Sequence, residues 1–203
     1  MSLSASQSID DKIVRSIRAT DSASAFSTKH FLQFGNAASV NKALNRLADK
    51  GTIRRIRKGL YDMPRQHPII GMTVPDTMGV VRALMEGSSA LWQVSGAYAA
   101  NLLGLSEQVT ARIDILTDGI SRKVALGNLT INFRHASPRN LIGAGTSAGT
   151  IIQAVRYLKR DGMTAQMIAK LNRQTDASTK KALLKLLPNV ALWMQPILKQ
   201  IAA

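Results

Sequence analysis

Apolar residues recur at helical spacing near the start of the chain. Ile9, Ile13 and Ile17 are spaced four residues apart with Val14 beside them, so one stripe of a helix beginning at Ile9 is apolar. Ser8 precedes this helix and is suited to cap it, because its hydroxyl can accept a hydrogen bond from an unpaired amide of the first turn. The pattern predicts an amphipathic helix that buries the apolar stripe.

Two further helical patterns follow along the chain. Ser27 is placed to cap a short helix over residues 28–34. Asn36 is placed to cap a third helix that runs to Lys50. Gly51 is suited to end it, because glycine adopts the left-handed conformation without strain. These patterns predict three helices in succession, of which the second is short.

The third predicted helix has two unlike faces. At about 100° per residue, Val40, Leu44 and Leu47 lie on one face and should be buried. The opposite face carries small, polar or charged residues: Ala38, Ser39, Lys42, Asn45, Arg46 and Asp49. A helix that enters the major groove of DNA needs such a face, because asparagine can bond adenine edges and cations reach guanine or phosphate. The alternative is an ordinary amphipathic surface helix.

Two short strands around a glycine are predicted in residues 52–62. Their apolar residues Ile53, Ile56, Leu60 and Tyr61 can pack inward, and four cations crowd the strand and the tip: Arg54, Arg55, Arg57 and Lys58. A basic hairpin after a polar-faced third helix is typical of a winged helix-turn-helix. There the hairpin lies along the phosphate backbone or enters the minor groove. A solvated run of charges that protects an edge strand is the alternative.

Two prolines mark a break after the hairpin. Pro64 and Pro68 interrupt regular structure and stiffen a connector. The sequence therefore predicts a DNA-binding domain over residues 1–66 and a second domain over residues 67–203.

The second domain mixes strand and helix patterns, which predicts an α+β fold with a small sheet first and a helical end. The expected elements are a helix over 77–85, a strand end and helix over 91–104, a strand over 112–117, a hairpin over 124–134, and helices over 150–160, 164–173, 178–187 and 190–201. The predicted fold class is α+β: an N-terminal winged helix-turn-helix followed by a mixed α/β C-terminal domain with a helical end.

The charge of the chain points to a polyanionic partner. Among 203 residues, 27 are Lys or Arg and 12 are Asp or Glu, giving a formal net charge of +15. Such an excess attracts nucleic acid first and anionic membrane next. No run of apolar residues is long enough to span a membrane, and the N-terminus lacks the pattern of a signal peptide. Together with the absence of cysteine, this favours a cytoplasmic location.

Little in the sequence indicates catalysis. His30, His67 and His135 are far apart and lack the spacing of metal ligands. Asp114 and Asp118 could form a carboxylate pair for acid–base chemistry, although polar residues at strand ends are commoner. No phosphate-binding glycine motif or nucleophile elbow is present. We therefore expect no metal, no cofactor and no enzymatic activity.

The helical end is strongly basic. After residue 150 the chain carries Arg156, Lys159, Arg160, Lys170, Arg173, Lys180, Lys181, Lys185 and Lys199 against only Asp161 and Asp176. This could be a second polyanion-binding surface or the solvated outer face of an amphipathic bundle. The two alternatives are not exclusive.

Two stretches resemble a known family, the AbiEi antitoxins of abortive-infection AbiE systems, which are type IV toxin–antitoxin pairs. Residues 43–61, ALNRLADKGTIRRIRKGLY, are similar to the recognition helix and wing of that family. Residues 94–105, VSGAYAANLLGL, with Gln108, Val109 and the hairpin to Phe133, resemble the start of its C-terminal domain. The resemblance covers residues 8–135 and does not extend to the helical end.

The resemblance implies an antitoxin that also represses its own operon by binding inverted repeats in the promoter. Its functional partner would be a nucleotidyltransferase-like toxin, neutralised without a stable complex. Carried onto this sequence, Ser39, Lys42, Asn45 and Arg46 would enter the DNA groove, and Arg54, Arg55, Arg57 and Lys58 would hold the backbone. A monomer in solution, with two copies on an inverted repeat, fits this role.

Two other functions stay open. One is a winged-helix transcriptional regulator whose second domain senses a ligand or dimerises. The other is an enzyme that uses DNA binding as a targeting arm, for which convergent acids near Asp114 would be required.

Overall fold

The computed structural model describes residues 8–19, 25–64, 66–67, 71–73, 76–107 and 112–203. The chain divides into two compact units, residues 1–88 and residues 89–203. Helices and β-sheets occur in both units, so the predicted α+β class is confirmed.

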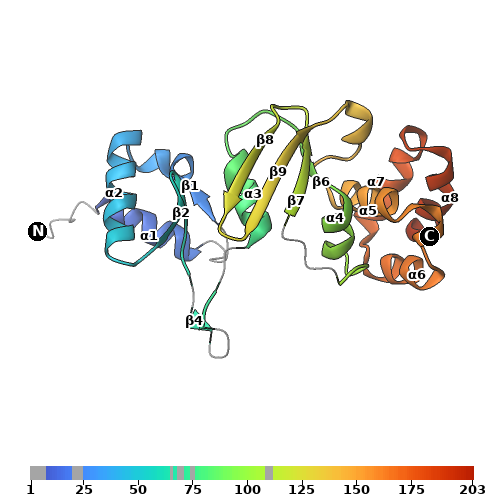
Figure 1. Ribbon diagram of the computed structural model, residues 1–203, viewed down its shortest axis with the longest axis horizontal. Coiled ribbons are helices and arrows are strands. Elements are labelled where there is room, and N and C mark those ends of the chain that lie inside the picture. Colours follow the sequence, from blue (N-terminus) through green and yellow to red (C-terminus); the bar gives the residue numbers. More distant parts are fainter. Residues whose placement is uncertain (1–7, 20–24, 65, 68–70, 74–75, 108–111) are drawn as a thin grey trace, which may run out of the picture. The chain divides into compact units, whose positions relative to one another are not determined.

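The N-terminal unit begins with the three predicted helices. Its elements are α1 (Ile9–Ala19), β1 (Phe26–Ser27), the 3-10 helix η1 (Thr28–Phe34), α2 (Ala37–Asp49), β2 (Arg54–Arg57), β3 (Leu60–Asp62), β4 (Gln66–His67), β5 (Gly71–Met72) and α3 (Thr77–Met85). Figure 1 shows α1 and α2 side by side. The second predicted helix is present as a 3-10 helix capped by Ser27.

One hydrophobic core holds this unit together. Its buried members come from α1, β1, η1, α2 and the hairpin region: Ile13, Ile17, Phe26, Phe31, Val40, Ala43, Leu44, Leu47, Ile53 and Tyr61. The rings of Phe26 and Phe31 meet edge to face with centroids 5.3 Å apart, a favourable aromatic geometry. Because α2 and the hairpin share this core, their exposed faces are held in a fixed relation to one another.

The hairpin belongs to a three-stranded antiparallel sheet in the order β1-β3-β2. Phe26 pairs with Tyr61 across β1 and β3, a strand that the sequence did not predict. A β-bulge interrupts the pairing between Arg55 and Arg57, and bulges re-aim the side chains around them. The turn residue Gly59 has φ +76°, a conformation that favours glycine.

The N-terminal unit extends beyond the predicted domain boundary at residue 66. The end of α3 is tied to the start of η1, since the Glu86 carboxylate accepts from the Ser27 hydroxyl at 2.6 Å and contacts His30 at 3.0 Å. These contacts place residues 77–88 in the first unit. Arg65 and Pro68 of the predicted break lie outside the described residues.

The C-terminal unit carries a four-stranded sheet in the order β6-β7-β9-β8. Its strands are β6 (Trp92–Val94), β7 (Arg112–Thr117), β8 (Arg122–Leu126) and β9 (Leu129–His135), and helix α4 (Gly96–Leu102) follows β6. The β8–β9 hairpin is as predicted, but β9 runs parallel to β7, while both outer pairs are antiparallel. Gln108 and Val109, which contribute to the family resemblance, lie outside the described residues.

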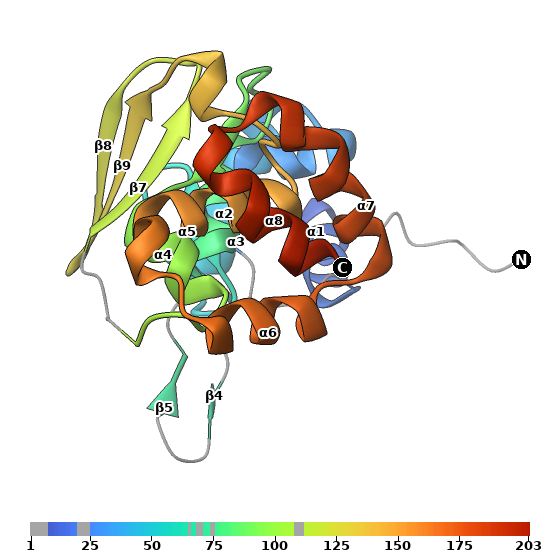
Figure 2. The ribbon, with the colours of Figure 1, turned by 90° about the vertical axis from the view of Figure 1, so that its right-hand side faces the viewer.

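A helical end completes this unit. It contains the 3-10 helix η2 (Pro138–Asn140), α5 (Ser147–Gly162), α6 (Ala165–Gln174), α7 (Ala177–Leu186), the 3-10 helices η3 (Leu187–Asn189) and η4 (Leu192–Met194), and α8 (Gln195–Ala202). Figure 2 shows α7 and α8 side by side in this bundle. Within the described residues, no helix combines the length and apolar character needed to cross a lipid bilayer.

Side-chain caps fix where these helices begin. Thr146, Thr164 and Asp176 each accept a hydrogen bond from an amide in the first turn of α5, α6 and α7. Near the end of α5, Lys159 has φ +59° and ψ −178°, which breaks the regular helix. This conformation is strained for every residue other than glycine.

Candidate functional site

Helix α2 presents a polar face to solvent, as predicted. Val40, Ala43, Leu44 and Leu47 are buried, whereas Ala38, Lys42, Asn45, Arg46 and Asp49 are exposed. Ser39 is half-buried, and its backbone amide donates to the capping side chain of Asn36 at 2.9 Å. The exposed residues form a face that combines small, amide and cationic side chains.

Tyr61 connects this face to the hairpin. Its ring is buried in the core, its hydroxyl donates to Asn45 Oδ1 at 3.2 Å, and the Arg55 guanidinium lies 5.9 Å from the ring centroid. Since the carbonyl side of the Asn45 amide faces Tyr61, its Nδ2 group is left to donate outward. The helix and the hairpin are thus linked through one side chain.

Arg46 is engaged by an acid of α1. Its Nη2 donates to Asp10 Oδ1 at 2.6 Å and its Nε donates to Asp10 Oδ2 at 3.2 Å. The Arg46 hydrogen bond lowers the pKa of Asp10 below its ordinary value, and the Asp10 carboxylate raises the pKa of Arg46. The Arg46 side chain is 53% exposed, so it remains within reach of a second anion.

Arg54 has a different environment from the other hairpin cations. It forms a two-point ion pair with Asp62, whose side chain is 4% exposed, and also donates to the carbonyl of Thr73 at 2.9 Å. The hydrogen bonds that Arg54 donates to the Asp62 carboxylate raise the pKa of Arg54. Arg54 therefore stabilises the hairpin against the following segment, a role that the run of cations in the sequence did not reveal.

The hairpin tip is cationic and open. Arg57 ends β2 and Lys58 begins the turn, and both are exposed. Apart from the chain neighbours of Gly59, no atom of the described residues lies within 4 Å of the position that a Cβ would take there. Such a tip can approach a phosphate backbone closely.

Asn41 is a member of the exposed α2 face that the sequence analysis left out. Its Oδ1 accepts from the hydroxyl of Thr28 at 2.8 Å, at the start of η1. Strict helical geometry would have included it, because Asn41 lies four residues before Asn45.

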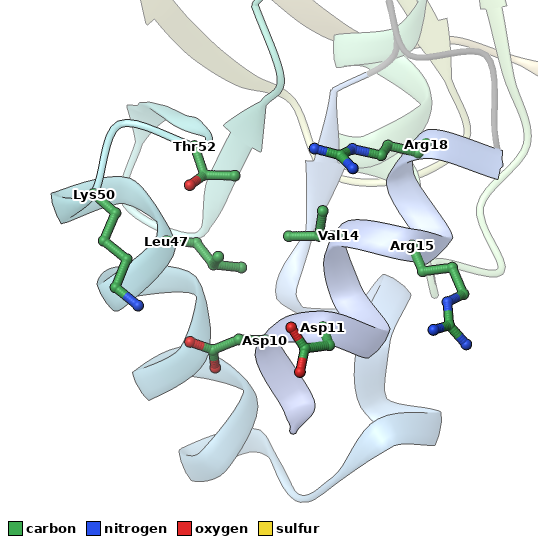
Figure 3. Close-up of a pocket in the computed structure, with 8 residues that line it drawn as sticks. All are labelled: Asp10, Asp11, Val14, Arg15, Arg18, Leu47, Lys50 and Thr52. Atoms are coloured by element: carbon green, nitrogen blue, oxygen red, sulfur yellow. The ribbon is translucent and has the colours of Figure 1, made fainter. Parts of the chain in front are cut away.

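A surface cavity of about 490 Å³ lies between α1 and the end of α2 (Figure 3). Val14 and Leu47 lie between the two helices in this view, and the rim is charged on both sides: Asp10, Asp11, Arg15, Arg18 and Lys50. Acids and cations share the rim, so the cavity has no single charge preference.

The candidate catalytic and metal-binding residues do not converge. Asp114 accepts from Asn132 at 2.8 Å and pairs with Arg112 and Arg134. Burial alone would raise the pKa of Asp114, but these hydrogen bonds and charges lower it below its ordinary value. Asp118 follows the last residue of β7, four residues after Asp114. At about 3.3 Å per residue, the two backbone positions are about 13 Å apart.

The histidines have different local partners. The His30 ring contacts Glu86 and that of His135 contacts the carbonyl of Gly119 at 3.1 Å, while the side chain of His67 lies outside the described part. Within the described residues, no group of three or more His, Cys, Asp or Glu side chains could hold a metal ion.

Comparisons with known proteins give a family without a known function. A family described as "Family of unknown function (DUF6088)" matches residues 12–184. Among solved structures, the chain is similar to the RV2827C protein from Mycobacterium tuberculosis, with 15% identity and a TM-score of 0.43 over 95% of this chain and 81% of that chain. No curated protein matches the chain.

Proposed function

We propose that this chain, which belongs to the DUF6088 family of unknown function, binds double-stranded DNA through its N-terminal unit and represses transcription. The observation that carries the proposal is the pairing of the polar face of α2 with a cationic hairpin through Tyr61, on one hydrophobic core. The order of elements, three helices and a basic hairpin, supports a winged helix-turn-helix.

The described contacts suggest different roles for the candidate residues. Lys42 and Asn45, exposed on α2, would meet base edges in the major groove, with Ser39 at their flank. At the hairpin, Arg55, Arg57 and Lys58 would bind phosphates.

Two of the candidate DNA-binding residues already form ion pairs within the protein. A phosphate at Arg46 would compete with the Asp10 carboxylate for the exposed guanidinium, and Arg54 is paired with Asp62. We therefore propose that Arg46 contacts a phosphate only in competition with Asp10, and that Arg54 stabilises the hairpin and does not contact DNA.

The orientation of Asn45 makes the base contact more specific. Because Tyr61 already donates to Asn45 Oδ1, the amide Nδ2 offers hydrogens to acceptors such as N7 and O6 of guanine. Oδ1 retains a second lone pair, so a bidentate contact with adenine would have to share this oxygen with Tyr61.

A titration of the full chain against the duplex upstream of its own gene tests the proposal, with a scrambled duplex as competitor. Sequence-selective binding that persists at about 150 mM salt is expected of a specific regulator. Equal, weak binding to both duplexes that disappears with salt would contradict it.

The antitoxin role is a further proposal, supported by the resemblance at residues 43–61 and 94–105. It requires a nucleotidyltransferase-like toxin encoded alongside. Expression of the full chain should relieve the growth arrest caused by that toxin, without a complex that survives purification. Persistent arrest in cells where the chain still represses its promoter would favour the regulator without antitoxin activity.

One observation favours the alternative of a ligand-sensing regulator. The C-terminal unit has a surface cavity of about 410 Å³ lined by residues of α4, α5, α6 and α7, including Lys170, Asp176 and Thr179. This volume lies in the range of small-molecule sites. A small molecule that changes DNA affinity through this cavity would support that alternative.

A further inference from the structure

A half-buried arginine on α5 is held by neutral partners. Arg156 Nη1 donates to Asn140 Oδ1 at 3.1 Å, and its Nη2 donates to the carbonyl of Arg139 at 3.3 Å. Gln153 on the same helix donates to the carbonyl of Asn140 at 2.7 Å, which fixes η2 against α5. The guanidinium is thus positioned by hydrogen bonds that leave its charge uncompensated.

The charged side chain that acts on Arg156 is another cation, Arg139. Burial lowers the pKa of Arg156, and the charge of Arg139 lowers it further. Within the described residues, no carboxylate forms an ion pair with Arg156. Arg54, the partly buried arginine of the other unit, shows the contrast, since it is paired with Asp62. Among the described residues these two cations form no ion pair with an acid, and a pair of cations in that situation attracts an anion.

Arg156 retains the geometry to bind that anion. An arginine has more N–H groups than its two described bonds occupy, and these lie in the plane of the guanidinium, which suits the oxygens of a phosphate. Arg139 is exposed at the same turn and can approach the same group. A phosphate bridging both guanidinium groups would offset their mutual repulsion.

The charge of the helical end favours a polymer of phosphates over a single phosphate. After residue 150 the chain has nine cations and two acids, and one of those acids, Asp176, is occupied in capping α7. We propose that Arg139 and Arg156 form a phosphodiester-binding site through which the C-terminal unit contacts the nucleic-acid backbone, separately from α2 and the hairpin.

The test uses the full chain carrying the hairpin substitutions Arg57→Ala and Lys58→Ala, so that contacts of the C-terminal unit dominate the remaining affinity for duplex DNA. Addition of Arg139→Ala should weaken this binding about tenfold and reduce the salt slope by about 1. Arg156→Lys should also weaken it, because lysine keeps the charge but loses the planar fork. Lys199→Ala, which removes an exposed cation of α8, is the matched control and should have a smaller effect.

Several results would overturn the proposal. One is equal loss for Lys199→Ala and Arg139→Ala, which would indicate a diffuse basic surface. Others are unchanged DNA affinity in both arginine variants, or binding only to inorganic phosphate or to vesicles of anionic phospholipid. Because Arg139 is exposed, its substitution tests the site even where a change at Arg156 unfolds the unit. Measuring Arg139→Ala in the unsubstituted chain as well keeps this test separate from that of the N-terminal unit.

Discussion

At the scale of single residues, the arginines of the N-terminal unit differ in whether an acidic side chain already pairs with them. Arg54 and Arg46 are each paired with an acid, whereas Arg57 lies exposed at the hairpin tip. Counting cations along the sequence treats these residues alike. Their partners separate a supporting arginine from one available to DNA.

Arg54→Ala should destabilise the N-terminal unit by about 2 kcal/mol, because it leaves the buried Asp62 carboxylate without its partner. Urea unfolding followed by circular dichroism measures this change. Arg57→Ala, at the other end of the same strand, is the control and should change the free energy of unfolding far less. Equal stability losses would contradict the supporting role of Arg54.

Asp10→Asn should increase affinity for DNA, because it releases Arg46 to bind a phosphate. The salt slope should become steeper by about 1. The control is Asp11→Asn, since Asp11 lies in the same turn and its hydrogen-bond partner is Ser8. If both variants gain affinity equally, the gain reflects net charge and Arg46 has no contact of its own.

Tyr61→Phe should alter base preference more than total affinity. Without the hydroxyl, the Asn45 amide loses the bond that sets its orientation and can present either end to a base. Selection of preferred duplexes from a randomised pool should show relaxed preference at one position with an unchanged salt slope. An unchanged preference would mean that Asn45 does not read a base in the orientation described.

Part of this residue-level picture was accessible from the sequence. The exposed positions Lys42 and Asn45 follow from helical periodicity, because the buried face of α2 repeats at regular spacing. The Asp10–Arg46 pair joins residues 36 positions apart, and no local pattern indicates it. Cross-strand pairing of Arg54 with Asp62 could have been inferred from the hairpin register.

At the scale of elements, helices were predicted well because capping residues and apolar stripes are local. Asn36, for example, caps α2 as expected. Strands of two residues, such as β1 and β4, were missed because tertiary pairing creates them rather than a periodic pattern. The later boundary of the N-terminal unit has the same origin, since Glu86 reaches back to Ser27 and His30.

The kink in α5 gives a prediction at this scale. Lys159→Gly should stabilise the C-terminal unit by about 1 kcal/mol, because glycine accepts the positive φ of this position without strain. Thermal or urea unfolding measures the change, with Lys159→Ala as a control that removes the charge and keeps the strain. Stabilisation by alanine equal to that by glycine would attribute the effect to charge.

At the scale of the whole molecule, the net charge of +15 favours polyanionic partners in general and does not locate a contact. The two units offer different chemistry: a polar helix face with a cationic hairpin in one, and in the other the arginines Arg139 and Arg156, which form no ion pair within the described part of the chain. A general basic surface and a specific DNA-binding unit both bind DNA at low salt. They differ in how binding responds to the loss of particular cations.

The most direct test of the central claim is therefore the salt dependence of DNA binding by the full chain with Arg57→Ala and Lys58→Ala, beside a control in which Lys199 and Arg173 are exchanged for alanine. We expect the hairpin variant to bind all duplexes more weakly, with a salt slope reduced by about 2, and the control to keep most of its affinity for the upstream duplex. A hairpin variant with an unchanged slope, or a control that loses as much, would contradict DNA binding through α2 and the hairpin.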